Sequence, residues 1–417
     1  MGEVELGLFT AALGLSAPWR VTRTEFDGSQ LDLYLEFPRG ARFPCPAKDC
    51  TEGACVVHDT ADKTWRHMDF FQYKAFLQAR LPRVRCPEHG VRQVSVSWAR
   101  PGSGFTMLFE ALALTFAAAM PVAKVAAMTR EHDTRIWRVL EHHVGAARDQ
   151  EDFSGVTKVG RDETSARKGQ DYVSIFADMV ARRVLFATEG RDAATVARFA
   201  TDLTAHGGDP TNITDTSSDM STAFISGIRA HLPNARMTFD RFHLAAKLSE
   251  AVDAVRRTEV TTRPELTHTR WLWLKNFSNL SAKQQGQLHQ LMRPSAQLAT
   301  ARALRWREDF PAFYDHDPSY APEYLKRWCN GAKRSRLPPL KDFVALVERH
   351  WDGVLAWHTS HLANGLLEGI NSLVQAAKAR ARGYRNKNKM ITIIYLTAAK
   401  LQLPTLTNPT PAYMPSR

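Results

Sequence analysis

Residues 156–188 read VTKVGRDETSARKGQDYVSIFADMVARRVLFAT. Short apolar runs bounded by polar and turn residues are typical of β-strands, which we place at 156–159, 172–177 and 183–188. The chain continues with an alternation of helical and extended patterns, predicting a helix, a strand, a helix and a strand at 193–204, 212–216, 220–231 and 236–239. This order predicts a mixed β-sheet with helical crossovers, within a multidomain α/β chain.

Three carboxylates stand where such a sheet could hold a metal. Asp162 follows the first predicted strand, Asp219 follows the fourth, and Glu368 lies on a predicted helix at 364–381. Oxygen ligands of this kind suit Mg²⁺, and two such ions can drive phosphoryl displacement. Asp215 is a rival for the second position because it also lies at the end of the fourth strand. A turn or helix-capping role is the alternative for any strand-end aspartate.

A Cys/His-rich segment lies near the amino terminus, between predicted strands at 29–37 and 73–84. Its candidate zinc ligands form a Cys-x₄-Cys pair and a Cys-Pro-Glu-His pair, namely Cys45, Cys50, Cys86 and His89. Thiolates and imidazoles on tight turns suit tetrahedral zinc. Cys55 could replace Cys45 or Cys50, and a metal-free β unit is the alternative.

Three short helices with a tight turn before the last one follow a Pro-Gly-Ser-Gly linker. We place them at 105–119, from 121 onward, and at 133–144. This pattern predicts a helix-turn-helix whose last helix enters the major groove of DNA. The residues that could then contact phosphates or bases are Thr134, Arg135 and Arg138. A helical linker with a solvated basic face is the alternative.

Residues 241–357 are predicted to be helical and are rich in tryptophan. The tryptophans Trp271, Trp273, Trp306, Trp328 and Trp351 either stack on DNA bases or form the core of this region. Six basic residues then follow Glu368 on what we interpret as the same helix, namely Lys378, Arg380, Arg382, Arg385, Lys387 and Lys389. They are either a solvated helix end or DNA contacts flanking the active site.

Several strings in this chain resemble those of the ISL-three family of bacterial insertion-sequence transposases. They include VGRDETSARKG, SSDMS, FDRFH, EGINS and ARGYRN, and the resemblance covers most of residues 40–400. It implies a ribonuclease-H-like core with Asp162, Asp219 and Glu368 as the metal-binding triad. The match to an Asp-x-x-His motif implies that Asp240 and His243 support catalysis, with contact to the scissile phosphate or a flipped base. A helix-capping Asp240 and a packed His243 are the alternative.

The family's zinc ribbon is written as two Cys-x-x-Cys pairs, and this chain departs from it in spacing and by His89. The resemblance also implies that an α-helical insertion fills the long interval between Asp240 and Glu368. The expected parts are an N-terminal segment, a zinc-ribbon-like unit, a helix-turn-helix, a first core part, the insertion, the final core helices with the basic tail, and a C-terminal tail, at 1–37, 38–100, 101–150, 151–245, 246–361, 362–400 and 401–417.

Composition agrees with a nucleic-acid partner, since the 417 residues carry a net charge of +12. The longest apolar run, Ala111–Ala123, is shorter than the roughly 20 residues of a spanning helix. We expect a cytoplasmic, nucleoid-associated DNA transposase that uses Mg²⁺ or Mn²⁺ and zinc. Its expected partners are double-stranded DNA and, in a homodimer or larger assembly, other copies of itself. The alternatives are a zinc and helix-turn-helix DNA binder with an inactive core, and a hydrolytic nuclease of the same fold.

Overall fold

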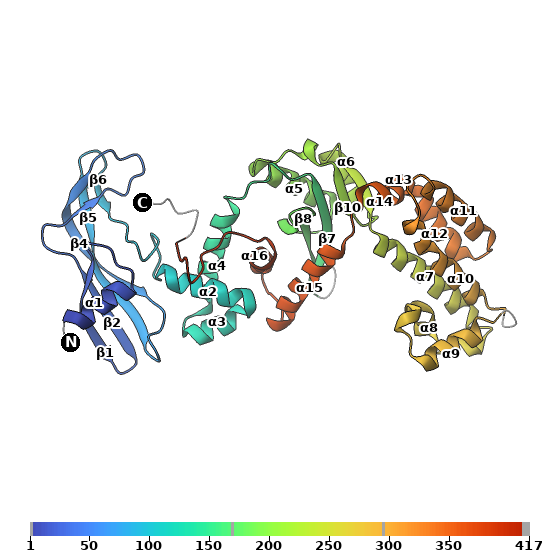
Figure 1. Cartoon of the computed structure of the whole chain (residues 1–417), viewed down its shortest axis with the longest axis horizontal. Helices are drawn as coiled ribbons and strands as arrows, with labels where there is room; N and C mark the ends of the chain where they lie inside the picture. The colour runs from blue at the N-terminus through green and yellow to red at the C-terminus, as the bar shows by residue number, and fades with distance from the viewer. Residues whose placement is uncertain (1–2, 168–170, 294–296, 411–417) are drawn as a thin grey trace. The chain divides into compact units, whose positions relative to one another are not determined.

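A computed structural model describes residues 3–167, 171–293 and 297–410 and shows a mixed α/β chain (Figure 1). Its internal contacts divide the chain into two compact units. The first comprises Met1–Glu151 together with Ala377–Arg417, and the second comprises Asp152–Ala376. By these contacts residues 377–417 group with the amino-terminal unit, while residues 362–376 of the part expected at 362–400 lie in the second unit.

The first unit opens with a helix and a six-stranded sheet (Figure 1). The strand order is β1-β2-β5-β4-β3, with β6 paired to β5. The elements are α1 (Glu3–Ala12), β1 (Arg20–Asp27), β2 (Gln30–Glu36), β3 (Arg42–Pro44), β4 (Ala54–Arg66), β5 (Lys74–Cys86) and β6 (Gly90–Gln93). The predicted strands at 29–37 and 73–84 are β2 and β5. Helix α1 and strands β1, β3, β4 and β6 were not predicted from the sequence. Much of β4 is exposed and polar, and its pairing with β5 holds it in the sheet.

The three predicted helices of the helix-turn-helix are present as α2 (Met107–Ala119), α3 (Val122–Thr129) and α4 (Asp133–Arg148). The side chain of Thr106 accepts a hydrogen bond from the Phe109 N–H and so caps α2. A further helix, α16 (Lys387–Ala398), lies in the part expected to hold the final core helices, but its bounds were not predicted. Its Ile393 is buried in the same hydrophobic cluster as Phe109 and Leu140, so α16 completes the core of this helical group.

A buried charge network ties α2 to α4 and to the linker before them. The Glu110 side chain is fully buried. Its carboxylate accepts hydrogen bonds from Arg100 Nε at 2.9 and 3.0 Å, from Ser103 Oγ at 2.7 Å, and lies 2.7 Å from His143 Nε2. Burial by itself would raise the pKa of Glu110, but His143 and Arg100 lower it. Glu110 is therefore held as a carboxylate in the interior.

Replacing Glu110 by glutamine is expected to lower the free energy of unfolding of this unit by about 3 kcal/mol, because the Arg100 guanidinium then loses its counterion. The stability given by Glu110 is present above its unfolded pKa and is lost as the pH falls through the lower folded pKa. Chemical denaturation at pH 7 measures the change. The control is Glu141→Gln at an exposed position of α4, which should stay within about 0.5 kcal/mol of wild type. Equal effects of the two substitutions would contradict the assigned role of Glu110.

The second unit contains a five-stranded sheet of order β11-β10-β7-β8-β9. Strands β7, β8 and β9 are antiparallel neighbours, whereas β10 and β11 run parallel to β7. The elements are β7 (Lys158–Arg167), β8 (Asp171–Asp178), β9 (Arg183–Glu189), α5 (Ala193–Ala205), β10 (Asp215–Ser218), α6 (Thr222–His231) and β11 (Arg236–Phe239). The predicted order and the mixed sheet are confirmed. The sheet packs on α5 and α6 through a cluster that includes Phe176, Phe199 and Phe224.

Strand β7 is longer than predicted and runs through polar residues. Asp162 was placed just past its end, but Asp162 lies within β7 and is paired with Ile175 of β8. The apolar run ends at Val159, yet backbone pairing with β8 continues the strand to Arg167. The polar side chains of this part of β7 are hydrogen-bonded to polar side chains of neighbouring elements; for example, Asp162 and Thr164 bond to Asn371 and Gln375.

The rest of the second unit is helical, as predicted (Figure 1). Its helices are α7 (Arg241–Glu259), α8 (Arg270–Leu274), α9 (Ala282–Leu291), α10 (Ala299–Asp309), α11 (Ala321–Arg334), α12 (Pro338–Arg349), α13 (Trp351–Leu355), α14 (Trp357–Ser360) and α15 (Gly365–Arg380). Short 3₁₀ turns occupy Pro210–Asn212, Pro264–Leu266, Phe277–Asn279 and Phe310–Asp315. Within the described residues, no helix is both long and apolar enough to cross a membrane.

The tryptophans of this helical region serve mainly as its core. Trp273 and Trp328 are buried, and Trp306 and Trp351 are partly buried against the same cluster. Trp271 differs, since it is 58 % exposed and lies under the guanidinium of Arg270. Of the five candidates, Trp271 is therefore the most accessible for stacking on a base.

Candidate functional site

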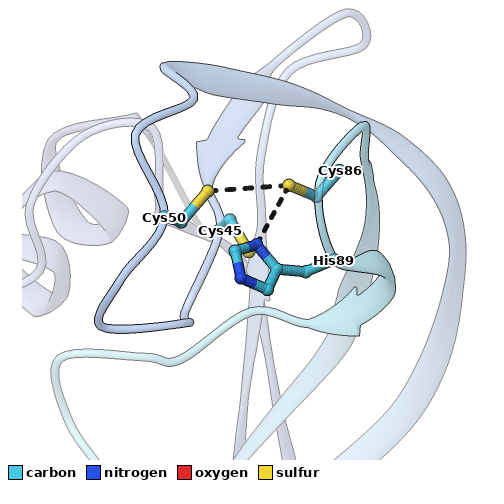
Figure 2. Close-up of side chains that lie close together, drawn as sticks. All are labelled: Cys45, Cys50, Cys86 and His89. Carbon is cyan, nitrogen blue, oxygen red and sulfur yellow. Dashed lines mark hydrogen bonds between the residues drawn. The ribbon is translucent and has the colours of Figure 1, made fainter.

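The four predicted zinc ligands lie together in the first unit (Figure 2). Cys45 and Cys50 come from the loop between β3 and β4, while Cys86 ends β5 and His89 lies in the turn before β6. Their ligand atoms all lie within 4.8 Å of one another. Cys55 is not one of these four residues; it is buried, and its Sγ lies 3.6 Å from the Gly53 carbonyl oxygen.

The spacing of these atoms fits a tetrahedral zinc ion. Cys50 Sγ lies 3.6 Å from Cys86 Sγ, and Cys86 Sγ lies 3.7 Å from His89 Nδ1. Zinc bonds of about 2.3 Å to sulfur and 2.0–2.1 Å to nitrogen place such atoms about 3.6–3.8 Å apart at tetrahedral angles. Burial alone would raise the pKa of Cys86, but hydrogen bonds from His89 and Cys50 lower it to about 6. A thiolate is thus favoured at one position of the group.

In the second unit, Asp162 is the carboxylate on the central strand. Its Oδ1 accepts a hydrogen bond from the Glu163 N–H at 2.8 Å, and its Oδ2 accepts one from Asn371 Nδ2 of α15 at 2.7 Å. Burial raises the pKa of Asp162 to about 6, against the hydrogen bond from Glu163 and the nearby His243. Asp162 is therefore a carboxyl group with little access to water, positioned by both β7 and α15.

Asp219 follows β10, as the sequence analysis expected, and is partly exposed. Its Oδ1 accepts a hydrogen bond from the Ser221 N–H at 3.3 Å and lies 3.5 Å from the buried guanidinium of Arg161. Arg161 also pairs with Glu163 at 2.8 Å and stacks over Phe224. Arg161 was not among the candidates predicted from the sequence. Its role follows from these contacts, which the sequence does not show.

The rival candidate Asp215 is at the opposite end of β10 from Asp219. It begins the strand rather than ending it, and it is buried. Its Oδ1 accepts hydrogen bonds from Arg236 at 2.6 and 2.9 Å. This ion pair gives Asp215 a structural role on β10 and β11, so the geometry favours Asp219.

Asp240 and His243 form a pair at the start of α7. His243 Nδ1 lies 3.1 Å from Asp240 Oδ2, and Asp240 makes no side-chain capping bond to the helix. The hydrogen bond to Asp240, together with the charges of Asp162 and Asp219, raises the pKa of His243. Asp240 is almost fully buried and its Oδ1 has no hydrogen-bond partner within the described residues. The pair therefore places a histidine that readily takes a proton beside the two aspartates.

Helix α15 carries Glu368 and is fixed to the sheet by neighbouring side chains. Asn364 Oδ1 accepts a hydrogen bond from Ser217 of β10 at 2.6 Å, and Gln375 Nε2 donates to Thr164 of β7 at 2.7 Å. Leu367 lies against Gly160, where an added Cβ would approach its methyl group to 2.9 Å. Glu368 itself is exposed, and within the described part of the chain its side chain has no hydrogen bond or ion pair.

The three candidate carboxylates do not form a compact cluster among the described residues. Among the described residues, the zinc-type cluster alone brings three or more metal-ligating atoms within 4.8 Å of one another. Asp162 lies on β7, Asp219 follows the neighbouring β10, and Glu368 lies on α15, whose flanking Asn364 and Asn371 are hydrogen-bonded to these strands. The residues that the sequence analysis missed here are Arg161 and Asn371; the EGINS string contains Asn371, but its contact with Asp162 follows only from the packing of α15.

The candidate DNA-contacting residues of the helix-turn-helix differ in whether their side chains are exposed and already paired. Thr134 and Arg138 are exposed on α4, and the Arg138 side chain has no hydrogen bond or ion pair within the described residues. Arg135 is instead paired with Glu131 and lies 4.2 Å from the centre of the Phe105 ring. Arg138 is therefore the arginine of α4 that is better placed to meet DNA.

The basic residues after Glu368 lie on two helices, whereas the sequence analysis placed them on one. Lys378 and Arg380 are on α15, which ends where Arg382 and Gly383 take positive φ angles of 56° and 93°. Arg385 lies in the connecting turn, and Lys387 and Lys389 are on α16. Arg380 donates to the Ala119 carbonyl at 2.6 Å, and the Lys389 ammonium lies 4.7 Å from the Trp137 ring centre. These two cations thus contact the helix-turn-helix group.

Three family models match successive parts of the chain. A zinc-finger model of the transposases IS204, IS1001, IS1096 and IS1165 matches residues 42–89, and a model for the helix-turn-helix domain of transposase family ISL3 matches residues 94–144. The ISL3 DDE model, described as a transposase, matches residues 159–394.

Whole proteins give the same result. The transposase for insertion sequence element IS1001 of Bordetella parapertussis is 27 % identical over 381 residues, covering 88 % of this chain and 91 % of that protein. The transposase for insertion sequence element IS1557 of Mycobacterium tuberculosis is 26 % identical over 433 residues, covering 94 % and 95 %. With a transposase model spanning more than half of its length, the chain belongs to the ISL3 family of transposases.

Proposed function

We propose that this protein binds the terminal inverted repeats of an insertion sequence and catalyses metal-dependent DNA cleavage and strand transfer. The observation that carries the proposal is the placement of the carboxylates. Asp162 lies on the central strand β7, Asp219 follows its neighbour β10, and α15 brings Glu368 to the same strands through Asn364 and Asn371. Three antiparallel strands followed by two parallel ones support a ribonuclease-H-like core, interrupted by the helical insertion at 246–361.

The donor set suits Mg²⁺ or Mn²⁺, because Asp162, Asp219 and Glu368 offer only oxygen ligands. Divalent cations bound there would activate a nucleophile and stabilise the leaving oxygen of a phosphodiester. The chain's own residues prepare the site: Asn371 orients Asp162 and Arg161 holds Asp219. His243, whose protonated form is favoured by Asp240, supplies a positive charge for a DNA phosphate.

DNA recognition is assigned to the first unit. Zinc at Cys45, Cys50, Cys86 and His89 would fix the loop before β4 to the turn before β6. Arg138 on α4 would contact bases or phosphates in the major groove. The basic residues of α15 and α16 would add salt-dependent affinity for phosphates. Since two element ends must be joined, we infer a homodimer or larger assembly acting on DNA in the nucleoid, within the cytoplasm.

Cleavage of a plasmid that carries the gene's own flanking DNA tests this proposal. With Mg²⁺, wild type is expected to cut at the element boundary, and Glu368→Gln is expected to bind but not to cut. Glu323→Gln, at an exposed position of α11, is the matched control and should cut like wild type. Cutting by Glu368→Gln would overturn the role of that residue. Binding without cutting by every variant would favour a DNA-binding protein with an inactive core.

A further inference from the structure

Asn371 is hydrogen-bonded to Asp162 through the amide nitrogen of its side chain alone. Its Nδ2 donates to Asp162 Oδ2 at 2.7 Å and to the Glu163 carbonyl at 3.3 Å. Both partners are acceptors, so the hydrogen-bond network fixes which end of the amide is nitrogen. The oxygen, Oδ1, must then point elsewhere.

Asn371 Oδ1 is buried and has no hydrogen-bond partner in the described part of the chain. Buried carbonyl oxygens in proteins are nearly always paired, because an unpaired one has lost its water without replacement. An amide oxygen beside a carboxylate is also a normal ligand for hard divalent cations. Mg²⁺ takes six oxygen ligands at about 2.0–2.1 Å and usually keeps several waters, so water molecules would complete the ligand set around such an oxygen.

Asn371 lies on the same face of α15 as Glu368. Asn364, Glu368, Asn371 and Gln375 follow one another at helical spacings of four, three and four residues, so they share one face of α15. Three of them are hydrogen-bonded to β7 or β10. Glu368 therefore lies one helical turn from Asn371, on the face that meets Asp162.

We propose that Asn371 is a further oxygen ligand of the divalent cation at Asp162, in addition to orienting that carboxylate. This inference rests on the proposed function, because it assumes that Asp162 binds a cation. In this arrangement the Asn371 Oδ1 binds the cation, while its Nδ2 donates a hydrogen bond to Asp162. One side chain then positions both the carboxylate ligand and the ion.

Mn²⁺ binding to the full-length, zinc-loaded protein tests the assignment without any DNA cleavage. Isothermal titration and electron paramagnetic resonance would compare wild type, Asp162→Ala, Asn371→Ala and Gln375→Ala. Gln375→Ala is the matched control, since Gln375 makes an equally short bond to β7 from the same face of α15. We expect Asn371→Ala to weaken Mn²⁺ binding about tenfold or more, and Gln375→Ala to leave it unchanged.

Loss of a residue that only orients Asp162 would also weaken Mn²⁺ binding. A spectroscopic signature therefore distinguishes a direct ligand from an orienting residue. In protein labelled with ¹³C at the asparagine carboxamide, electron–nuclear double resonance should show a ¹³C coupling to bound Mn²⁺ that Asn371→Ala removes. If Mn²⁺ binding depends on Asp162 but shows no such coupling, Asn371 is not a ligand and the proposed function stands. If Mn²⁺ binds wild type and Asp162→Ala alike, or not at all, both proposals fail.

Discussion

Replacing Asp162 by asparagine is expected to reduce Mg²⁺-dependent DNA cleavage by at least about 10³-fold and to leave DNA binding unchanged. The substitution keeps the side-chain volume but removes the charge that would hold the cation on β7. DNA binding is unaffected because the zinc-type cluster and α4 belong to the first unit, whereas Asp162 belongs to the second. Gel-shift titration and a plasmid cleavage assay measure the two properties side by side.

The pH dependence of cleavage checks the same assignment. Burial raises the pKa of Asp162 to about 6, and only the ionised form can bind a cation. Cleavage should therefore fall as the pH is lowered through 6, about tenfold per pH unit. In the metal-free protein, ionisation of Asp162 costs stability as the pH rises through 6, so Asp162→Asn should be at least as stable as wild type at pH 7. DNA cleavage by the Asp162→Asn variant would contradict the role of this carboxylate.

Replacing Cys86 by serine is expected to cost most of the zinc affinity of the amino-terminal sheet. Structural zinc sites bind with about 10–16 kcal/mol, so an equal share for each of four ligands is roughly 2.5–4 kcal/mol, or about 60-fold or more in affinity. The sheet has its own buried core, which includes Trp65 and Leu77. We therefore expect local loosening rather than unfolding of the sheet.

Zinc content by mass spectrometry and hydrogen exchange together measure this effect. Faster exchange should be confined to the loop before β4 and the turn between β5 and β6, and a strong chelator should reproduce it in wild type. Cys55→Ser is the control, because it removes a neighbouring thiol that is not one of the four clustered ligands. Full zinc content in Cys86→Ser would exclude Cys86 as a ligand.

Local sequence patterns predicted much of the fold. The helices of the helix-turn-helix and the order of strands in the mixed sheet follow from hydrophobic periodicity, which is set by neighbouring residues. Elements with weak periodicity were missed. Strand β4 is largely exposed, and α16 is identified by the partners of Ile393 rather than by its own pattern.

The candidate sites also combine residues that the sequence predicted with contacts that only the folded structure provides. Residue type and spacing selected the four zinc-type ligands and made Asp162, Asp219 and Glu368 candidates, and the resemblance to ISL3 transposases favoured these three as the triad. Only the tertiary structure placed Asp215 at the far end of β10, paired Arg161 with Asp219, and joined Asn371 to Asp162 across more than two hundred residues. These contacts depend on which strands become neighbours and on the face that α15 turns to them. The sequence by itself therefore determined the chemistry available to this protein, and long-range packing decided which side chains meet to use it.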